Sequence, residues 1–219
     1  MRRAWLAPIT GIAFLTLSCG LSAGEARRGA GAELAGVAGL PAAAGLPELA
    51  QGGGGEPAEG HVAALAAYLE TKPTGLTRSE VTDLARAVLA ESGRYQLDPR
   101  LVLAVMHVES RYQTFAVSPV GAMGLMQLLP TTAMELADRL GIPWQGTQTL
   151  FDPVLNVRLG TAYVKQLSDR YGSVKAALAA YNWGPGHIDR RLRSGESLPQ
   201  VYPSLVLDAY GRTPTSRSS

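Results

Sequence analysis

The stretch LVLAVMHVESRY, residues Leu101 to Tyr112, decides the fold, because it is apolar almost throughout and then presents the carboxylate of Glu109. Asp98 and Pro99 directly before it supply a helix cap and a proline suited to the first helical turn. The apolar residues then cover most sides of the expected helix, which is typical of a helix inside a domain. The stretch therefore predicts a buried helix that ends at an acid. Glu109 is either a solvated acid at a helix end or an acid held in apolar surroundings for chemistry.

Helix signals continue on both sides of this stretch. Thr77 to Glu80, TRSE, has the form of a capping box, and a run with helical spacing follows it until Gly93. No sustained period-two alternation bounded by hairpin turns occurs, although a short hairpin or loop insertion is expected around residues 118–124. We therefore predict an all-α fold. Further helices are expected, from caps, glycine stops and apolar spacing, at residues 131–140, 152–171, 173–182 and 202–210.

The N-terminal part of the chain has a different composition. It starts with Met-Arg-Arg, and Trp5 to Leu17 is an apolar run too short and too interrupted by proline for a membrane span. This pattern predicts a signal peptide and hence an exported protein. The residues after it are rich in alanine, glycine, proline and glutamate, which predicts a flexible linker, although His61 to Glu70 suits a short helix within it. The expected organisation is a signal peptide at 1–19, a linker at 20–75, a folded catalytic domain at 76–212 and a disordered tail at 213–219.

Cys19, the single cysteine, lies in LTLSCG, where the signal should be cut. A lone cysteine has no partner for an internal disulfide, so in an oxidising compartment it needs another explanation. The segment resembles the lipobox of bacterial lipoproteins, in which the cysteine is acylated and becomes the new N-terminus. This resemblance predicts a lipid anchor at Cys19 that holds the protein on a bacterial membrane, the outer membrane. The alternative is a chance cysteine within a signal that is cut later, near residues 21–23.

The charge balance argues against a nucleic-acid partner, and the positions of the histidines argue against a metal site. Lysine and arginine exceed aspartate and glutamate by 20 − 18 = 2, and Arg2 and Arg3 of the signal account for that excess. A nearly neutral mature protein lacks the clustered basic face that nucleic-acid binding requires. His61, His107 and His187 are scattered, with no pair at the spacing of metal ligands and no cysteine partner. We therefore expect no nucleic-acid partner, no metal site and no cofactor.

Four motifs occur in order along the folded part of the chain: ES at Glu109, SPVGAMGLMQLLP at residues 118–130, LFDPVLNVRLGTAYV at 150–164 and AAYNWGPG at 179–186. In this order and spacing they resemble the transglycosylase domain of the soluble lytic transglycosylase family, over residues 97–210. The resemblance implies a lysozyme-like helical fold and an enzyme that cleaves the glycan strands of peptidoglycan in the periplasm. Two alternatives stay open: a lysozyme-type muramidase, which is a hydrolase, and a non-catalytic peptidoglycan-binding lipoprotein.

The expected chemistry needs a carboxylic acid that is protonated near neutral pH. Apolar surroundings raise the pKa of such an acid by disfavouring its charged form, and Glu109 follows an apolar stretch. Asp152 and Asp189 are poor candidates for a second carboxylate, because the sequence around them indicates a helix start and a charged surface helix. The resemblance implies that Glu109 acts twice. It protonates the oxygen that leaves C1 of N-acetylmuramic acid, and it then takes the proton of the C6 hydroxyl, which yields a 1,6-anhydromuramoyl end.

The resemblance assigns substrate-binding roles to five further residues. Ser118 would orient the acetamido group of the sugar and the acid, with a turn residue before a proline as the alternative. Gln127 can donate and accept hydrogen bonds toward sugar groups, whereas Met126 beside it also suits ordinary core packing. Tyr181 would reach the catalytic acid and position it. Asn182 after it either binds substrate or ends the helix before a glycine.

Two positions depart from the family pattern. Trp183 stands where a small residue is usual, which predicts a larger aromatic wall beside a sugar ring. Gln200 replaces the acid expected in the C-terminal LP-ET-x-YV arrangement, and the segment from Leu198 to Tyr210 is shorter than usual. The shape of that end of the cleft, and with it exo or endo cleavage, therefore stays open.

Overall fold

The computed structural model describes residues 57–212, and the predicted signal peptide, Cys19, the tail and most of the predicted linker lie outside the described residues. Within this range the chain forms helices and no strand, and isolated bridges pair Val117 with Met123 and Met123 with Leu128. The prediction of an all-α fold is confirmed. The elements are α1 (Glu59–Glu70), α2 (Arg78–Tyr95), α3 (Pro99–Ser110), α4 (Pro130–Arg139), the 3-10 helix η2 (Thr147–Phe151), α5 (Pro153–Tyr171), α6 (Val174–Trp183), α7 (Pro185–Arg193) and α8 (Val201–Arg212). None of these helices between residues 57 and 212 is long and apolar enough to span a membrane.

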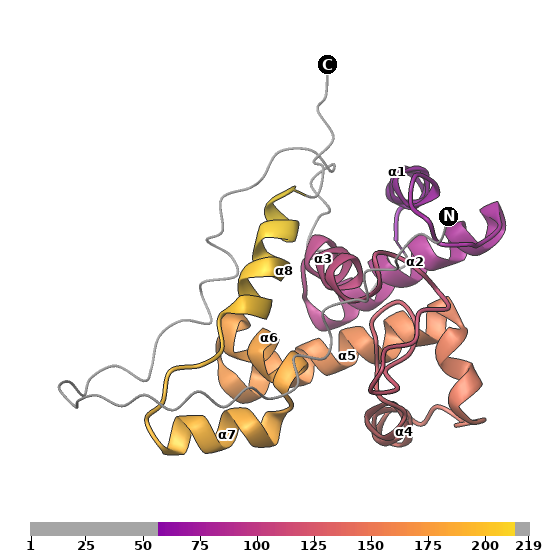
Figure 1. Ribbon diagram of the computed structural model, residues 1–219. Coiled ribbons are helices and arrows are strands. Elements are labelled where there is room, and N and C mark those ends of the chain that lie inside the picture. The colour runs from indigo at the N-terminus through magenta and orange to yellow at the C-terminus, as the bar shows by residue number, and fades with distance from the viewer. Residues whose placement is uncertain (1–56, 213–219) are drawn as a thin grey trace, which may run out of the picture.

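Helix α3 lies at the centre of the described structure. Figure 1 shows it almost along its axis, between α2 and the upright α8, with the long α5 below. The residues from Leu101 to Met106 are all at 4% exposure or less, so α3 has no solvent face over this length. It packs directly against α2 and α8. Helix α5 packs against α2 and α6, and α6 packs against α8. The apolar stretch that predicts a buried helix is therefore the helix that the others enclose.

Local signals start the helices as the sequence predicts. The Thr77 side chain accepts a hydrogen bond from the Glu80 N–H at 3.4 Å, and Glu80 Oε2 accepts one from the Thr77 N–H at 2.7 Å, which completes a capping box. Asp98 caps α3 by accepting from the backbone N–H two residues later at 2.8 Å. One end differs from the prediction, because α2 continues past Gly93 and stops only where Gln96 adopts the left-handed conformation, with φ 54°.

The N-terminal boundary of the folded domain is the main correction to the predicted organisation. Composition predicts a linker up to residue 75, but α1 packs into the main core. Its apolar face, made of Val62, Leu65, Ala66 and Leu69, is buried to 7% exposure or less in the same cluster as α2 and α3. The spacing of three and four residues places these side chains on one face, and the surrounding alanines and glycines conceal this pattern in the composition. The linker prediction is therefore wrong for α1, and the folded domain begins before residue 76.

Candidate active site

Glu109 lies in the last turn of α3 and is 2% exposed. The hydroxyl of Tyr202, on α8, donates a hydrogen bond of 2.5 Å to its Oε1. Burial raises the pKa of Glu109 to about 8, and the bond from Tyr202, which favours the charged form, acts in the opposite direction with a smaller effect. The carboxyl is therefore protonated at neutral pH and able to give a proton. The interpretation of Glu109 as a solvated helix end is wrong.

Two tyrosines, from α6 and α8, lie beside this acid. The rings of Tyr181 and Tyr202 are stacked, with centroids 6.4 Å apart and planes at 5°. Burial raises the pKa of both phenols, and the nearby Glu109 raises it further. The Tyr181 hydroxyl donates to the carbonyl oxygen of Met126 at 2.8 Å. The hydrogen bond to the acid that the sequence assigns to Tyr181 is therefore made by Tyr202, and Tyr181 instead connects α6 to the loop before α4.

Ser118 closes a turn in that loop. Its Oγ accepts a hydrogen bond from the Ala122 N–H at 3.0 Å, and its own N–H donates to the Ala122 carbonyl oxygen at 2.9 Å. The residue is 5% exposed. Ser118 thus has the turn role that the sequence left open. Because its oxygen accepts in this turn, its hydroxyl hydrogen keeps the capacity to donate to a ligand.

Gln127 holds the same loop from inside. Its Nε2 donates to the carbonyl oxygens of Ala116 and Gly124, at 3.0 and 2.9 Å. Its backbone is left-handed, with φ 48°, so these two bonds stabilise a conformation that a non-glycine residue rarely adopts. Its Oε1 is buried and has no hydrogen-bond partner among residues 57–212. Because this oxygen is shielded from solvent, the amide of Gln127 acts here on the loop, and a substrate contact by Gln127 stays a prediction.

The side chain of Met126 packs in the core, which is one of the two roles that the sequence left open, and a substrate contact by this residue stays a prediction. It is 0% exposed and packs on Gly160 of α5, where an added Cβ would lie 2.3 Å from its Sδ. Its N–H donates to Asn156 Oδ1 at 2.8 Å, and Asn156 Nδ2 donates to the carbonyl oxygens of Met123 and Leu150 at 3.0 and 2.9 Å. Asn156 anchors the loop on α5. The sequence analysis missed it, although a lone amide within the apolar run VLNV was an available signal.

Asn182 and Trp183 form the end of α6. Asn182 is half-buried, and Gly184 directly after the helix has φ 79°, a conformation that favours glycine and ends the helix. The indole of Trp183 is 41% exposed and stacks on His187 of α7, with centroids 5.0 Å apart and planes at 26°. Trp183 therefore presents an aromatic face at the surface, while a substrate contact by Asn182 stays a prediction.

The other ionisable candidates have structural partners. Asp152 Oδ1 accepts from the Leu155 N–H at 2.9 Å and caps α5. Asp189 accepts a hydrogen bond of 2.8 Å from the Tyr171 hydroxyl and pairs with Arg170 at 2.5 Å. Over the described range, no group of three His, Cys, Asp or Glu side chains is placed to hold a metal ion. Glu109 is thus distinguished from these aspartates by its burial and by its partner.

Comparison with known proteins assigns this arrangement to a family. Residues 86–200, which are 115 of the 219 residues, match the model of the family described as "Transglycosylase SLT domain". The chain belongs to this family. The match contains Glu109, the loop with Ser118 and Gln127, and Tyr181. It excludes α1 and α8, which lie on either side of it.

Individual members of the SLT family are similar over about half of the chain. The transglycosylase of Enterobacteria phage PRD1 is 39% identical over 130 residues, covering 52% of this chain and 46% of the relative. The membrane-bound lytic murein transglycosylase C of Histophilus somni is 34% identical over 131 residues, covering 52% and 36%. The 70 kDa soluble lytic transglycosylase of Escherichia coli has a similar structure, with a TM-score of 0.50 and 25% identity, covering 68% of this chain and 29% of that one. The chain therefore spans less than half the length of these relatives.

Tyr202 is, after Asn156, the second residue at this SLT site that the sequence analysis missed. It follows Gln200 by two positions, in the segment where the chain departs from the usual family arrangement. The signal that could have identified it is the tyrosine of the LP-ET-x-YV arrangement, which Tyr202 matches. Its contact with Glu109 joins residues 93 positions apart, so only the packing of α8 on α3 reveals it.

Proposed function

We propose that this SLT-family chain is a peptidoglycan lytic transglycosylase that cleaves the β-1,4 bond between N-acetylmuramic acid and N-acetylglucosamine. The observation that carries the proposal is the state of Glu109, which is 2% exposed, has a pKa raised by burial to about 8 and is hydrogen-bonded to a phenol. Such a carboxyl is protonated at neutral pH and suited to protonating a glycosidic oxygen. The relatives named as transglycosylases of murein support the same substrate.

The proposed reaction uses one carboxyl twice. First, the Glu109 proton goes to the bridging oxygen, the bond from this oxygen to C1 breaks, and the carbonyl oxygen of the sugar's acetamido group bonds to C1. Second, the Glu109 carboxylate takes the proton of the C6 hydroxyl, whose oxygen displaces the acetamido oxygen at C1. The product is a 1,6-anhydromuramoyl end, the acid regains its proton, and no water is consumed. The tethered hydroxyl has a proximity that free water lacks.

The surroundings of Glu109 favour this route over hydrolysis with two carboxylates. Retaining glycosidases hold their carboxyl groups roughly 5 Å apart, and inverting ones hold them about 6.5 to 9.5 Å apart. Asp152 caps a helix and Asp189 is ion-paired with Arg170, so both have other roles. Among the described residues, the ionisable groups that interact with Glu109 are the phenols of Tyr181 and Tyr202. A single acid is what the intramolecular route requires.

For substrate binding, the proposal retains Ser118 and Gln127. The hydroxyl hydrogen of Ser118 can donate to the acetamido group of the sugar, and Gln127 contributes by holding the backbone of the loop in place. Both residues belong to the loop that Asn156 anchors on α5. Their positions are therefore held by the core rather than by the ligand.

Product analysis on purified sacculi tests this function. Wild-type protein should release muropeptides with anhydro ends, each lighter by one water than the product of a hydrolase, as measured by mass spectrometry. Glu109→Gln, with its helix content checked by circular dichroism, should release either product at a rate lower on the order of a hundredfold or more. Reducing ends from the wild type would make the protein a muramidase, and folded wild-type protein that released no product would leave only peptidoglycan binding.

We also propose that the protein is exported to the periplasm and attached to a bacterial outer membrane through Cys19. The signal-like start and the lipobox-like LTLSCG support this localisation, as does the relative named as membrane-bound. Wild-type protein made in a Gram-negative host should sediment with the outer membrane, and Cys19→Ala should stay soluble or unprocessed. Exported wild-type protein that is wholly soluble would contradict the anchor.

A further inference from the structure

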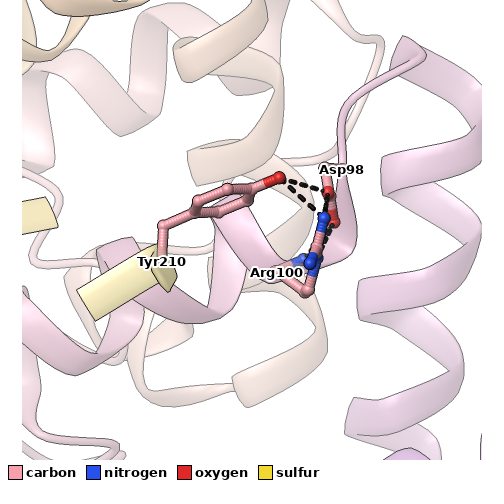
Figure 2. Close-up of polar contacts among 3 residues, drawn as sticks. All are labelled: Asp98, Arg100 and Tyr210. Atoms are coloured by element: carbon pink, nitrogen blue, oxygen red, sulfur yellow. Dashed lines mark hydrogen bonds and ion pairs between the residues drawn. The ribbon is translucent and has the colours of Figure 1, made fainter. Parts of the chain in front are cut away.

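Helix α8 is attached to α3 by a tyrosine near each of its ends. Tyr202, in its first turn, donates to Glu109 near the end of α3. Tyr210, in its last turn, contacts Asp98 and Arg100 at the start of α3, and Figure 2 shows its hydroxyl directed at both side chains. The two tyrosines are 210 − 202 = 8 residues apart, which is about 12 Å along a helix. Both attachments involve α3, the helix that carries the acid.

Asp98, Arg100 and Tyr210 form a closed set of hydrogen bonds, here called the α8 clamp. The Tyr210 hydroxyl donates to Asp98 Oδ2 at 2.7 Å and accepts from Arg100 Nη2 at 2.8 Å. Arg100 Nη2 also donates to Asp98 Oδ2 at 2.6 Å, so each member bonds to the other two. Burial by itself would raise the pKa of Asp98, but the bonds from Arg100 and Tyr210 outweigh it and lower the pKa. The clamp is therefore charge-assisted at neutral pH, where such bonds are strongest.

The clamp constrains the hydrogen bond at the other end of α8. One attachment would let the helix pivot or slide on α3, whereas two attachments along its length determine both its rotation and its translation. Val206 and Ala209, between the two tyrosines, are at most 6% exposed and fill the contact. The bond from Tyr202 to Glu109 is short, at 2.5 Å, and hydrogen bonds weaken steeply when length and angle change. A small displacement of α8 is thus enough to weaken it.

We propose that the α8 clamp is a positioning element for the catalytic acid, which holds α8 in the register that keeps the Tyr202 hydroxyl bonded to Glu109. The effect of the α8 clamp on catalysis rests on the proposed function. Tyr202 and Tyr210 both follow residue 200, where the SLT family match ends. The segment after the match therefore supplies both the partner of the acid and the residue that holds this partner in place.

The clamp has a consequence for the titration of Glu109. The titratable groups that face this carboxyl are Tyr202 of α8 and Tyr181 of α6, and the bond from Tyr202 favours the charged form. Loss of that bond removes a stabilisation of the carboxylate, so the pKa of Glu109 should rise further. Tyr202→Phe should raise it by about one unit, which corresponds to one hydrogen bond. Tyr210→Phe, acting through Tyr202, should raise it by a fraction of that amount.

The experiment is a ¹³C NMR titration of the Glu109 carboxyl in the full chain, assigned by its absence in Glu109→Gln. Tyr202→Phe and Tyr210→Phe should both move the midpoint upward, and the double variant should move it no further than Tyr202→Phe alone. On sacculi, Tyr210→Phe should lower kcat severalfold and leave KM unchanged, since the clamp lies at the opposite end of α3 from Glu109. If Tyr210→Phe unfolds the protein, Asp98→Asn is the second variant, because asparagine also caps helices.

A matched control exists elsewhere in the molecule. Tyr171, Asp189 and Arg170 make the same kinds of contact, with bonds to Asp189 of 2.8 Å from Tyr171 and 2.5 Å from Arg170, but they join α5 to α7. Tyr171→Phe should lose comparable thermal stability and leave the Glu109 midpoint unchanged. An unchanged midpoint in Tyr210→Phe, or a further shift in the double variant, would overturn the proposal. The titration needs no turnover, so it judges the clamp even if product analysis rejects the transglycosylase function.

Discussion

Two of the chain's three Glu-Ser dipeptides stand in similar surroundings, ESGRY at residues 91–95 and ESRY at 109–112, and the structure treats these two glutamates differently. Glu91 lies in the last turns of α2 and Glu109 in the last turn of α3, on helices that pack against each other. Both are buried, at 8% and 2% exposure, and burial raises the pKa of both. Local sequence is therefore similar for the two acids, and both are shielded from solvent, Glu109 more completely than Glu91.

The partners of the two acids also differ. Glu91 has two cations, with Arg94 Nε at 3.6 Å and Arg158 Nε at 3.8 Å from its oxygens, and both lower its pKa. Glu109 has the neutral phenol of Tyr202, and its pKa reaches about 8. The cations beside Glu91 offset part of the rise in pKa that burial causes, whereas for Glu109 only the bond from Tyr202 offsets it, with a smaller effect than burial. More complete burial together with the absence of a neighbouring cation thus distinguishes Glu109, the acid proposed as proton donor, from Glu91.

The largest expected effect separates the two acids by activity. Glu109→Gln should lower the rate of muropeptide release on the order of a hundredfold or more, because it removes the proton donor and leaves the shape of the side chain. Glu91→Gln, the matched control, should stay within a few-fold of the wild type. Rates are compared on sacculi at equal folded fraction, measured by circular dichroism. Equal losses of rate in the two variants would contradict the different roles of Glu109 and Glu91.

The next effect is the pH dependence of turnover. Since Glu109 must carry its proton to begin the reaction and has a pKa of about 8, the rate should fall roughly tenfold per pH unit above that value. Glu91→Gln should leave this midpoint in place, because Glu91 lies outside the groups that act on Glu109. A midpoint that moved in Glu91→Gln would instead couple the two acids. The measurement is the initial rate of product release from pH 5 to 10.

The smallest effect concerns stability. The folded pKa of Glu109, about 8, exceeds its ordinary value of 4.5, so its contribution to stability is fully present below pH 4.5 and is lost as pH rises through 8. Glu109→Gln should therefore have a higher free energy of unfolding than the wild type over this window, by about 1–3 kcal/mol. This difference corresponds to a Tm that is higher by roughly a few degrees. Glu91→Gln should gain less, because the arginines already offset the burial of its charge. A larger increase in Tm for Glu91→Gln than for Glu109→Gln, measured by calorimetry, would contradict this prediction.

Sequence predicts those parts of the structure that depend on near neighbours. The caps at Thr77 and Asp98 act over two or three residues, and the helices begin where these residues indicate. Met126 and α1 depend instead on what packs against them. Gly160 leaves the space that encloses Met126, and the core made by α2 and α3 gives α1 a surface to bury. Such contacts have no local signature, so composition placed α1 in a linker and left both roles open for Met126.

The sequence by itself determined the all-α class and the family, and it predicted Glu109 as the acid, because four motifs in order distinguish Glu109 from the similar dipeptide at Glu91. Only the tertiary structure decided which group holds that acid. Tyr202 meets Glu109 across 93 positions of the chain, while Tyr181, the nearer candidate, bonds to the Met126 carbonyl. The physical reason is that helix caps and apolar periodicity act within a few residues, whereas the proton affinity of a buried carboxyl depends on whichever side chains the packing of distant helices brings against it.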